Sequence, residues 1–285
     1  MPVAIDKLLA YSIPVVRQTL TRQQTAFYAL SVGLGVDSLD ERQLRYVDYS
    51  RDLQALPSMA LVLGHPGFWL ADPDSGVDPQ SVVHGEQELT IHHPLPVEGE
   101  VTGETRIVDV VDKGPGQGAL LYTRKEVRNA ADNRLLASTL NTTFLRGGGG
   151  FGGNNSATRQ TPLPERAPDL SIDFVTRPEQ ALYYRLNGDD NPLHASPSVA
   201  RACGFSRPIL HGLCTFGIVS HALIRALADY DASLLRSMAL RFSSPVLPGE
   251  TIRTEIWNNG AFRARVVERD TVVVTNGLAT FATTA

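Results

Sequence analysis

The residues best suited to chemistry lie in one run of the chain, residues 184–194, with the sequence Tyr-Arg-Leu-Asn-Gly-Asp-Asp-Asn-Pro-Leu-His. Gly188 permits a sharp bend with positive φ, and Asn191 followed by a proline is a good start for a short helix. We expect Asp189 to project from the bend and His194 from the first helical turn, so that carboxylate and imidazole converge. Such a pair takes up and releases protons near neutral pH.

A second run, residues 208–217, reads Pro-Ile-Leu-His-Gly-Leu-Cys-Thr-Phe-Gly. Gly212 stands at the entrance to an apolar helix, where free N–H groups and the helix dipole stabilise negative charge on an oxygen. Alone, an Asp-x4-His spacing is common and a glycine at a helix start is more often a packing residue. Together the two runs supply a base, an acid and an oxyanion donor, which chemistry next to a carbonyl requires.

The elements that must position these residues form two similar halves. Apolar runs predict one buried helix per half, at 56–70 and 213–228. Alternating runs predict strands at 102–112, 118–128 and 135–145, and then at 237–242, 251–258, 261–268 and 272–282. Residues 94–104 and 245–255 repeat the same turn, with Pro and Gly-Glu feeding a strand. The pattern predicts an α+β fold in which an antiparallel sheet wraps a helix, made twice, with the two sheets paired edge to edge.

A glycine- and proline-rich stretch divides the halves. We expect an N-terminal half at 1–146, a linker at 147–168 and a C-terminal half at 169–285. Within the linker, Gly148, Gly150 and Gly153 match the dinucleotide pattern GxGxxG. Nearby prolines forbid the helix that such a motif opens, so we interpret the stretch as a linker or packing segment.

Composition excludes several classes of protein. The 285 residues are 20% charged and 42% hydrophobic with a net charge of −4, so we expect a globular core and no nucleic-acid partner. Only Cys203 and Cys214 occur, which excludes a disulfide scaffold and favours a reducing compartment. With no signal-peptide pattern and no membrane-spanning run, the sequence predicts a cytoplasmic protein without a membrane partner.

The remaining histidines and cysteines have simpler interpretations. His92 and His93 are adjacent, so on a strand they face opposite sides and cannot share a metal ion. His65 is expected to be structural or to line a channel, and His221 to be a core histidine with a hydrogen-bond partner. Cys214 is expected to be a packing thiol rather than a nucleophile.

The chain resembles the type 2 enoyl-CoA hydratases, a branch of the MaoC-like hydratases that also forms the hydratase part of peroxisomal multifunctional enzyme type 2. The resemblance covers nearly the whole chain and is most specific at residues 184–194. The other matching motifs lie at 56–57, 84–87, 94–96, 112–114, 149–153, 204–205 and 208–217. The chain departs from the family where Ala195 and Ser196 follow the histidine, so we expect the pocket wall to differ there.

The resemblance implies a double hot-dog fold, with each half a sheet wrapped around a long helix. It also implies reversible syn addition of water to a trans-2-enoyl-CoA, giving the (3R)-3-hydroxyacyl-CoA, without a metal or organic cofactor. Asp189 and His194 would be the catalytic pair, Asn191 would orient it, and the N–H of Gly212 would bind the thioester oxygen. The implied substrate-binding residues are His84, Gly85, Lys113, Asp190, Leu193, His211 and Phe242. A homodimer is expected from the family.

The first half lacks its own Gly-Asp-x-Asn-Pro-x-His, so we expect one active site per chain and a first half that holds the acyl chain. Two other functions stay open. A hot-dog thioesterase usually carries a carboxylate on the central helix, and 213–228 has none. A non-catalytic acyl-CoA-binding module would not need the complete motif. Straight-chain, branched, aromatic and steroid side-chain thioesters all fit, as do both directions of the reaction.

Overall fold

The computed structural model describes residues 2–153 and 162–282, so the middle of the predicted linker, residues 154–161, lies outside the described residues. The helices are α1 Ile5–Ala10, α2 Arg22–Ser31, α3 Glu41–Val47, α4 Gln180–Arg185, α5 Pro197–Ala202 and α6 Gly212–Ala228. The short 3-10 helices are η1 Pro57–Leu61, η2 Trp69–Ala71, η3 Pro73–Ser75, η4 Pro79–Ser81, η5 Pro192–His194 and η6 Ala232–Leu234. The strands are β1 Val16–Leu20, β2 Val82–Ile91, β3 Gly99–Asp112, β4 Ala119–Asn129, β5 Leu135–Leu145, β6 Leu170–Val175, β7 Leu235–Phe242, β8 Thr251–Ile256, β9 Ala261–Val266 and β10 Thr271–Phe281.

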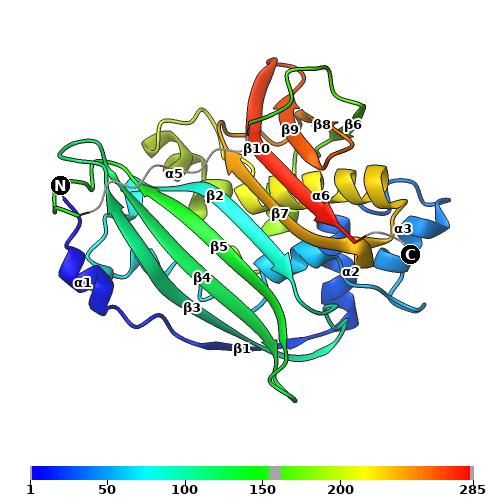
Figure 1. The fold of residues 1–285 in the computed structure, drawn as a ribbon, viewed down its shortest axis with the longest axis horizontal. Coiled ribbons are helices and arrows are strands. Elements are labelled where there is room, and N and C mark those ends of the chain that lie inside the picture. Colours follow the sequence, from blue (N-terminus) through cyan, green and yellow to red (C-terminus); the bar gives the residue numbers. More distant parts are fainter. Residues whose placement is uncertain (1, 154–161, 283–285) are drawn as a thin grey trace.

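The strands of the described residues form one antiparallel sheet in the order β1-β3-β4-β5-β2-β7-β10-β9-β8-β6 (Figure 1). The first five belong to the N-terminal half and the last five to the C-terminal half. The halves join where β2 pairs with β7, from Glu86 opposite Arg241 to Thr90 opposite Ser237. Edge-to-edge pairing therefore covers one open edge of each half, as the sequence predicts.

The central helix of the C-terminal half is α6, which runs beside β7 and β10 in Figure 1. Apolar side chains surround most of it, and Phe216, Val219 and Leu223 are fully buried. The helix ends at Asp229, whose left-handed φ of 44° reverses the chain. The prediction of a helix at 213–228 is confirmed, and the start of α6 is fixed at Gly212.

The predicted helix at 56–70 is wrong. The run forms the short η1, a series of turns and the start of the short η2, although most of it is buried. Gly64 adopts φ +58° and packs so closely on Gly103 of β3 that an added Cβ would lie 2.5 Å from its Cα. Pro66 follows two residues later and has no N–H for a helix. Close backbone packing thus replaces a continuous helix in the N-terminal half.

A buried lysine stabilises the end of η1 and the turn that follows it. Lys125 of β4 is 6% exposed and lies between Thr123 and Val127 on the buried face of the strand. Its Nζ donates to the main-chain oxygens of Ala60, Leu61 and Leu63 at 3.0, 2.8 and 2.7 Å. Lys125 therefore satisfies carbonyl groups that a longer helix would have satisfied internally.

The seven predicted strands all occur, with ends shifted by up to three residues. Strands β1, β2 and β6 and helices α1 to α5 were not predicted. The α+β double hot-dog class is confirmed, with the difference that the N-terminal half carries η1 where a long helix was expected. None of the helices described here combines the length and the apolarity needed to cross a bilayer.

Candidate active site

The loop after α4 holds Asp189 and His194 close together. Gly188 has φ +105°, which turns the chain sharply before Asp189. Asn191 caps η5, because its side-chain oxygen accepts from the N–H of Leu193 at 3.0 Å. The main-chain N–H of Asn191 also donates to the Asp189 carboxylate at 3.3 Å. The bend and cap predicted from the sequence are both present, and Asn191 connects the carboxylate to the short helix that carries His194.

His194 is buried and held in one tautomer. Its Nδ1 lies 2.9 Å from the main-chain oxygen of Ile209. Because a carbonyl oxygen only accepts, Nδ1 carries the proton and Nε2 keeps its lone pair. Burial lowers the pKa of His194 from its ordinary value, against the opposing effects of Ile209 and the Asp189 charge. The ring is therefore neutral at pH 7 and able to accept a proton.

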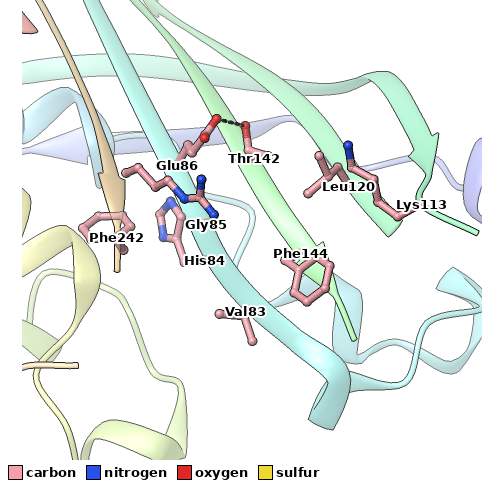
Figure 2. A pocket seen from close by; sticks show the side chains of 10 residues that line it. Val83, His84, Gly85, Glu86, Lys113, Leu120, Thr142, Phe144 and Phe242 are labelled. Carbon is pink, nitrogen blue, oxygen red and sulfur yellow. Dashed lines mark hydrogen bonds between the residues drawn. The ribbon is translucent and has the colours of Figure 1, made fainter. Parts of the chain in front are cut away.

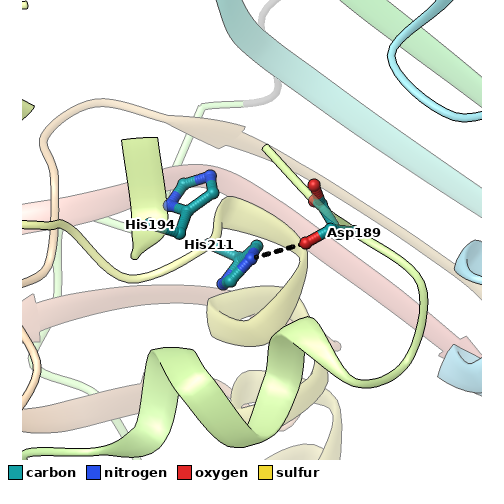
Figure 3. Close-up of side chains that lie close together, drawn as sticks. All are labelled: Asp189, His194 and His211. Atoms are coloured by element: carbon teal, nitrogen blue, oxygen red, sulfur yellow. Dashed lines mark hydrogen bonds between the residues drawn. The ribbon is translucent and has the colours of Figure 1, made fainter. Parts of the chain in front are cut away.

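His211 lies beneath this pair at the entrance to α6 (Figure 3). Its Nε2 donates to the main-chain oxygen of Asp189 at 3.3 Å, and its ring stacks on His194 with centroids 3.8 Å apart. Burial, followed by the neighbouring His194, lowers the pKa of His211. His211 therefore supports the pair from behind as a neutral imidazole.

Asp189, His194 and His211 also offer ligand atoms within 4.8 Å of one another, as a metal site would. Two of the four ring nitrogens already donate to main-chain oxygens. The rings are stacked with an interplanar angle of 27°, so their in-plane lone pairs do not converge on one point. This geometry does not fit a single tetrahedral ion.

Gly212 is the first residue of α6, so its N–H has no acceptor within the helix. The ring of Phe242 covers it, because a Cβ added at Gly212 would lie 3.3 Å from the Phe242 Cζ. Phe242 also contacts His84 edge-on at 4.8 Å between ring centroids. A glycine therefore leaves just enough room between the helix start and the aromatic ring.

A cavity of about 290 Å³ opens beside Phe242 (Figure 2). It brings together four residues that the resemblance assigns to substrate binding, and it adds two charged residues that the sequence did not single out, Glu86 and Arg241. The lining is Val83, His84, Gly85, Glu86, Lys113, Leu120, Thr142, Phe144, Arg241 and Phe242. Burial lowers the pKa of His84 to about 4, and the Asp189 charge acts in the opposite direction, so this cavity lies within electrostatic range of the loop that carries Asp189.

Three of the expected binding residues do not line this cavity. His211 lies against Asp189 and His194 instead. The Asp190 side chain is 83% exposed and pairs with Arg185 at 3.5 Å. Leu193 is half-buried in η5 and does not line the cavity. Asp190 is thus held at the surface, away from the cavity, although it directly follows Asp189.

The glycine-rich segment packs on the end of β3. The Asp112 carboxylate accepts from the N–H groups of Gly150 and Gly114, each at 2.8 Å, and of Gly152 at 2.6 Å. These bonds, led by that from Gly150, lower the pKa of Asp112. A protein carboxylate therefore occupies the N–H groups that a dinucleotide phosphate would need, in agreement with the packing interpretation. The same contact fixes the chain next to Lys113.

The other singled-out side chains are structural. The Nδ1 of His221 lies 3.4 Å from the Val32 oxygen. His92 and His93 bond separately to Ser138 and to the Leu135 oxygen. Cys203 and Cys214 are free thiols, Cys214 is fully buried, and burial raises its pKa, which suits packing rather than nucleophilic attack. His65, on the turn after Gly64, is the exception: Lys125, Asp189 and His84 act electrostatically on its ring, so a channel-lining role stays a prediction.

Together these features define a double hot-dog protein with an Asp–His pair at the start of its central helix. Residues 19–147 match the MFE-2 hydratase 2 N-terminal domain, and residues 159–282 match the MaoC like domain. The chain belongs to the MaoC-like and MFE-2 hydratase 2 family, and it is an enzyme of that hydratase class.

Two curated relatives are similar over most of their length. The 3-hydroxyacyl-thioester dehydratase Y of Mycobacterium tuberculosis is 40% identical over 86% of this chain and 84% of its own. The peroxisomal enoyl-CoA hydratase 2 of Arabidopsis thaliana is 35% identical over 94% of this chain and 93% of its own.

Solved structures agree with this assignment. A MaoC-like dehydratase from Phytophthora capsici superposes with a TM-score of 0.85 at 32% identity, over 99% of this chain and all of that one. A Mycobacterium tuberculosis protein described as having a double hotdog fold superposes with a TM-score of 0.59 at 15% identity, over 99% of this chain and 98% of that one, which supports the fold alone.

Proposed function

We propose that this protein catalyses the reversible syn hydration of trans-2-enoyl-CoA thioesters to (3R)-3-hydroxyacyl-CoA thioesters. The observation that carries the proposal is the proximity of Asp189, neutral His194 and His211, the residue that precedes α6, whose polar side-chain atoms lie within 4.8 Å of one another. The relatives named enoyl-CoA hydratase and hydroxyacyl-thioester dehydratase support this reaction class, because the two names describe hydration and the reverse dehydration.

The proton transfers follow from the tautomer of His194. Its Nε2 accepts a proton from water while the water oxygen forms a bond to C3. The resulting imidazolium, stabilised by the Asp189 carboxylate, returns a proton to C2 on the same face of the substrate. Water is thereby divided into the hydroxyl at C3 and the hydrogen at C2, with syn geometry. A positioned pair of this kind contributes roughly 10²–10⁴-fold.

Gly212 and Asn191 complete the proposed machinery. As C3 is attacked, negative charge develops on the thioester oxygen, and the free N–H of Gly212 with the α6 dipole stabilises it. Asn191 orients the pair through its N–H bond to Asp189 and its cap on η5. Reversal of the same steps eliminates water from a hydroxyacyl thioester, so the proposal covers both directions.

The cavity beside Phe242 is proposed to take the CoA portion of the substrate. Lys113 and Arg241 supply positive charge suited to its phosphates, and Phe242 lies between this cavity and Gly212. A thioester in the cavity would reach the catalytic loop past the His84 and Phe242 rings. We retain His84, Gly85, Lys113 and Phe242 as proposed binding residues and add Arg241.

The division of labour between the halves is part of the proposal. The C-terminal half, 169–285, carries the catalytic motif, and the N-terminal half, 1–146, contributes acyl and CoA binding, with 147–168 as the linker. The thioesterase alternative is disfavoured because α6 carries no carboxylate from Gly212 to Ala228. A homodimer and a cytoplasmic location stay predictions, and light scattering with subcellular fractionation would test them.

The experiment is a direct hydration assay with trans-2-enoyl-CoA thioesters of several chain lengths. Loss of the conjugated-thioester absorbance measures the rate, and product analysis gives the configuration at C3. We expect the 3R product from the wild-type protein. Asp189→Asn and His194→Gln should each lower kcat by roughly 10²-fold or more.

Two matched variants serve as controls. Asp132→Asn and His92→Gln remove the same kinds of group at exposed positions and should keep the wild-type rate. Release of free CoA thiol without hydration would instead identify a thioesterase. Retained acyl-CoA binding with neither reaction would identify a binding module.

A further inference from the structure

Four buried polar atoms lie behind the catalytic pair with no direct hydrogen-bond partner among the described residues. They are the hydroxyls of Tyr28, Ser58 and Tyr184 and the Nδ1 of His211. All four residues are 0% exposed. Since buried polar groups in folded proteins are almost always hydrogen-bonded, a cluster of four requires an explanation.

The four residues are neighbours that come from four different elements. The ring centroids of Tyr28 and Tyr184 lie 6.3 Å apart, and those of Tyr184 and His211 lie 5.1 Å apart. Burial raises the pKa of Tyr28, whereas interactions of hydrogen-bond type with the Ser58 and Tyr184 hydroxyls lower it, so the three hydroxyls lie near one another although none meets hydrogen-bond geometry. A polar line thus runs from η1 through α2 and α4 to the entrance of α6.

His211, at one end of this group of polar side chains, contacts the catalytic pair. The Nε2 of His211 donates to the main-chain oxygen of Asp189, and its ring stacks on His194. If His211 carried its proton on Nδ1 instead, the Nε2 lone pair would face the Asp189 oxygen and repel it. A hydrogen-bond donor directed at Nδ1 favours the Nε2–H tautomer, and the Tyr184 hydroxyl is the neighbouring group able to provide one.

We propose that Ser58, Tyr28 and Tyr184 form a buried hydrogen-bonded relay, completed by internal water, that fixes the tautomer of His211 and thereby orients Asp189 and His194. Tyr184, Tyr28 and His211 are then positioning residues and do not touch the substrate. The inference rests on the proposed hydratase function and extends it, because it connects η1 of the N-terminal half to the catalytic loop of the C-terminal half. Internal water commonly bridges buried polar groups that lack a direct partner.

The test compares three tyrosine-to-phenylalanine variants in the full chain. Tyr184→Phe should lower kcat for enoyl-CoA hydration by roughly three- to tenfold, with KM unchanged within about twofold because ground-state binding is not altered. Tyr28→Phe should lower kcat in the same direction. A packing role alone would change the melting temperature without this separation of kcat from KM.

Tyr46→Phe is the matched control. Tyr46 is equally buried, but its hydroxyl donates to the Tyr230 oxygen and accepts from the Ala232 N–H, away from the catalytic loop. This variant should lower the melting temperature and leave kcat unchanged. A similar fall in kcat in Tyr46→Phe would show that any buried tyrosine has this effect and would overturn the proposal.

A double-mutant cycle tests whether the relay acts through His211. His211→Gln keeps an amide N–H near the Nε2 position, within reach of the Asp189 oxygen, but has no polar atom at the Nδ1 position, and adding Tyr184→Phe to it should lower kcat no further. Multiplicative effects of the two substitutions would overturn the relay, as would an unchanged kcat in Tyr184→Phe. If the wild-type protein does not hydrate enoyl-CoA at all, the proposed function fails first, and the relay fails with it.

Discussion

At the scale of single residues, the site contrasts two stacked histidines that hold their protons on different nitrogens. His194 donates from Nδ1 to Ile209, and His211 donates from Nε2 to Asp189. Both are buried and therefore neutral near pH 7. Only His194 keeps an Nε2 lone pair beside the Asp189 carboxylate, which makes it the member of the stack suited to accept the proton of water.

The pH dependence of the reaction follows from this neutrality. The catalytic base must be unprotonated, and burial lowers the pKa of His194 below the ordinary value of about 6.5. As pH falls, activity should therefore persist through about pH 6.5 and be lost only at lower pH. A profile of kcat/KM against pH reports this acid limb for the free enzyme. A midpoint at or above about 6.5 would contradict neutral His194 as the base.

The tight space at Gly212 gives a second prediction at the residue scale. In Gly212→Ala the oxyanion N–H is retained, but the new Cβ would lie 3.3 Å from the Phe242 Cζ, so the ring or the substrate must shift. We expect kcat to fall roughly tenfold, less than the 10²–10³-fold that loss of an oxyanion donor costs. Stability should change little, since alanine favours the helix.

The control for this substitution varies Phe242, the residue that the added methyl group would contact. Gly212→Ala should be compared in a Phe242→Leu background, where the smaller side chain makes room for the methyl group. The alanine should then cost less than it does beside phenylalanine. An equal loss of kcat in both backgrounds would mean that steric contact with Phe242 is not the cause.

At the scale of secondary-structure elements, the local sequence pattern predicts an element correctly where residues close in sequence determine its structure. The strands β3, β4 and β5 and the helix α6 follow directly from alternation and from apolar composition. The run at 56–70 looks helical by the same rule, yet its structure depends on Gly103 and Lys125, which are distant in sequence. β2 was missed because a register shift at Gly85, between His84 and Glu86, interrupts its alternation.

The candidate site likewise has parts that local sequence signals predict and parts that they do not. The bend at Gly188, the cap at Asn191 and the helix start at Gly212 are local signals and could be predicted. The expectation that the two runs lie together came from the family resemblance, because no local signal connects them. Arg241 was missed because it enters the cavity only when β7 pairs with β2, and no motif marks that residue. Conversely, Asp190 occupies the variable position of the motif between Asp189 and Asn191, and its side chain faces solvent, because successive residues of a turn point in different directions.

Substitution of Lys125 tests what stabilises η1 and the turns that stand where a helix was predicted at 56–70. Lys125→Met keeps a side chain of similar length and leaves the buried oxygens of Ala60, Leu61 and Leu63 without their donor. We expect the free energy of unfolding to fall by roughly 3 kcal/mol, about 1 kcal/mol for each hydrogen bond. Urea denaturation followed by circular dichroism measures it.

Lys7→Met, at an exposed position of α1, is the comparison for this loss. It removes the same charge without breaking a buried hydrogen bond and should change stability by less than about 0.5 kcal/mol. Equal stability of the two variants would show that Lys125 does not hold the turn after η1.

At the scale of the whole molecule, sheet and core both cross from one half to the other. The largest apolar cluster contains Val127 and Leu136 of the N-terminal half together with Phe216 and Leu240 of the C-terminal half. A smaller cluster near the N-terminus includes Leu121, which lies on the same strand as Val127. Because shared strands connect the clusters, local loss of either one should destabilise the other.

The two tryptophans allow this cooperativity to be measured, since Trp69 packs against the smaller cluster and Trp257 is buried in the C-terminal half. Trp257→Phe leaves fluorescence to report on the first half, and Trp69→Phe leaves it to report on the second. Within each variant we expect the urea transition by fluorescence to coincide with that by far-UV circular dichroism, because a continuous sheet unfolds as one unit. If Trp69 fluorescence changed at lower urea than the dichroism of the same variant, the N-terminal half would be an independent unit. The β2–β7 junction would then join two separately folded halves without making them one cooperative structure.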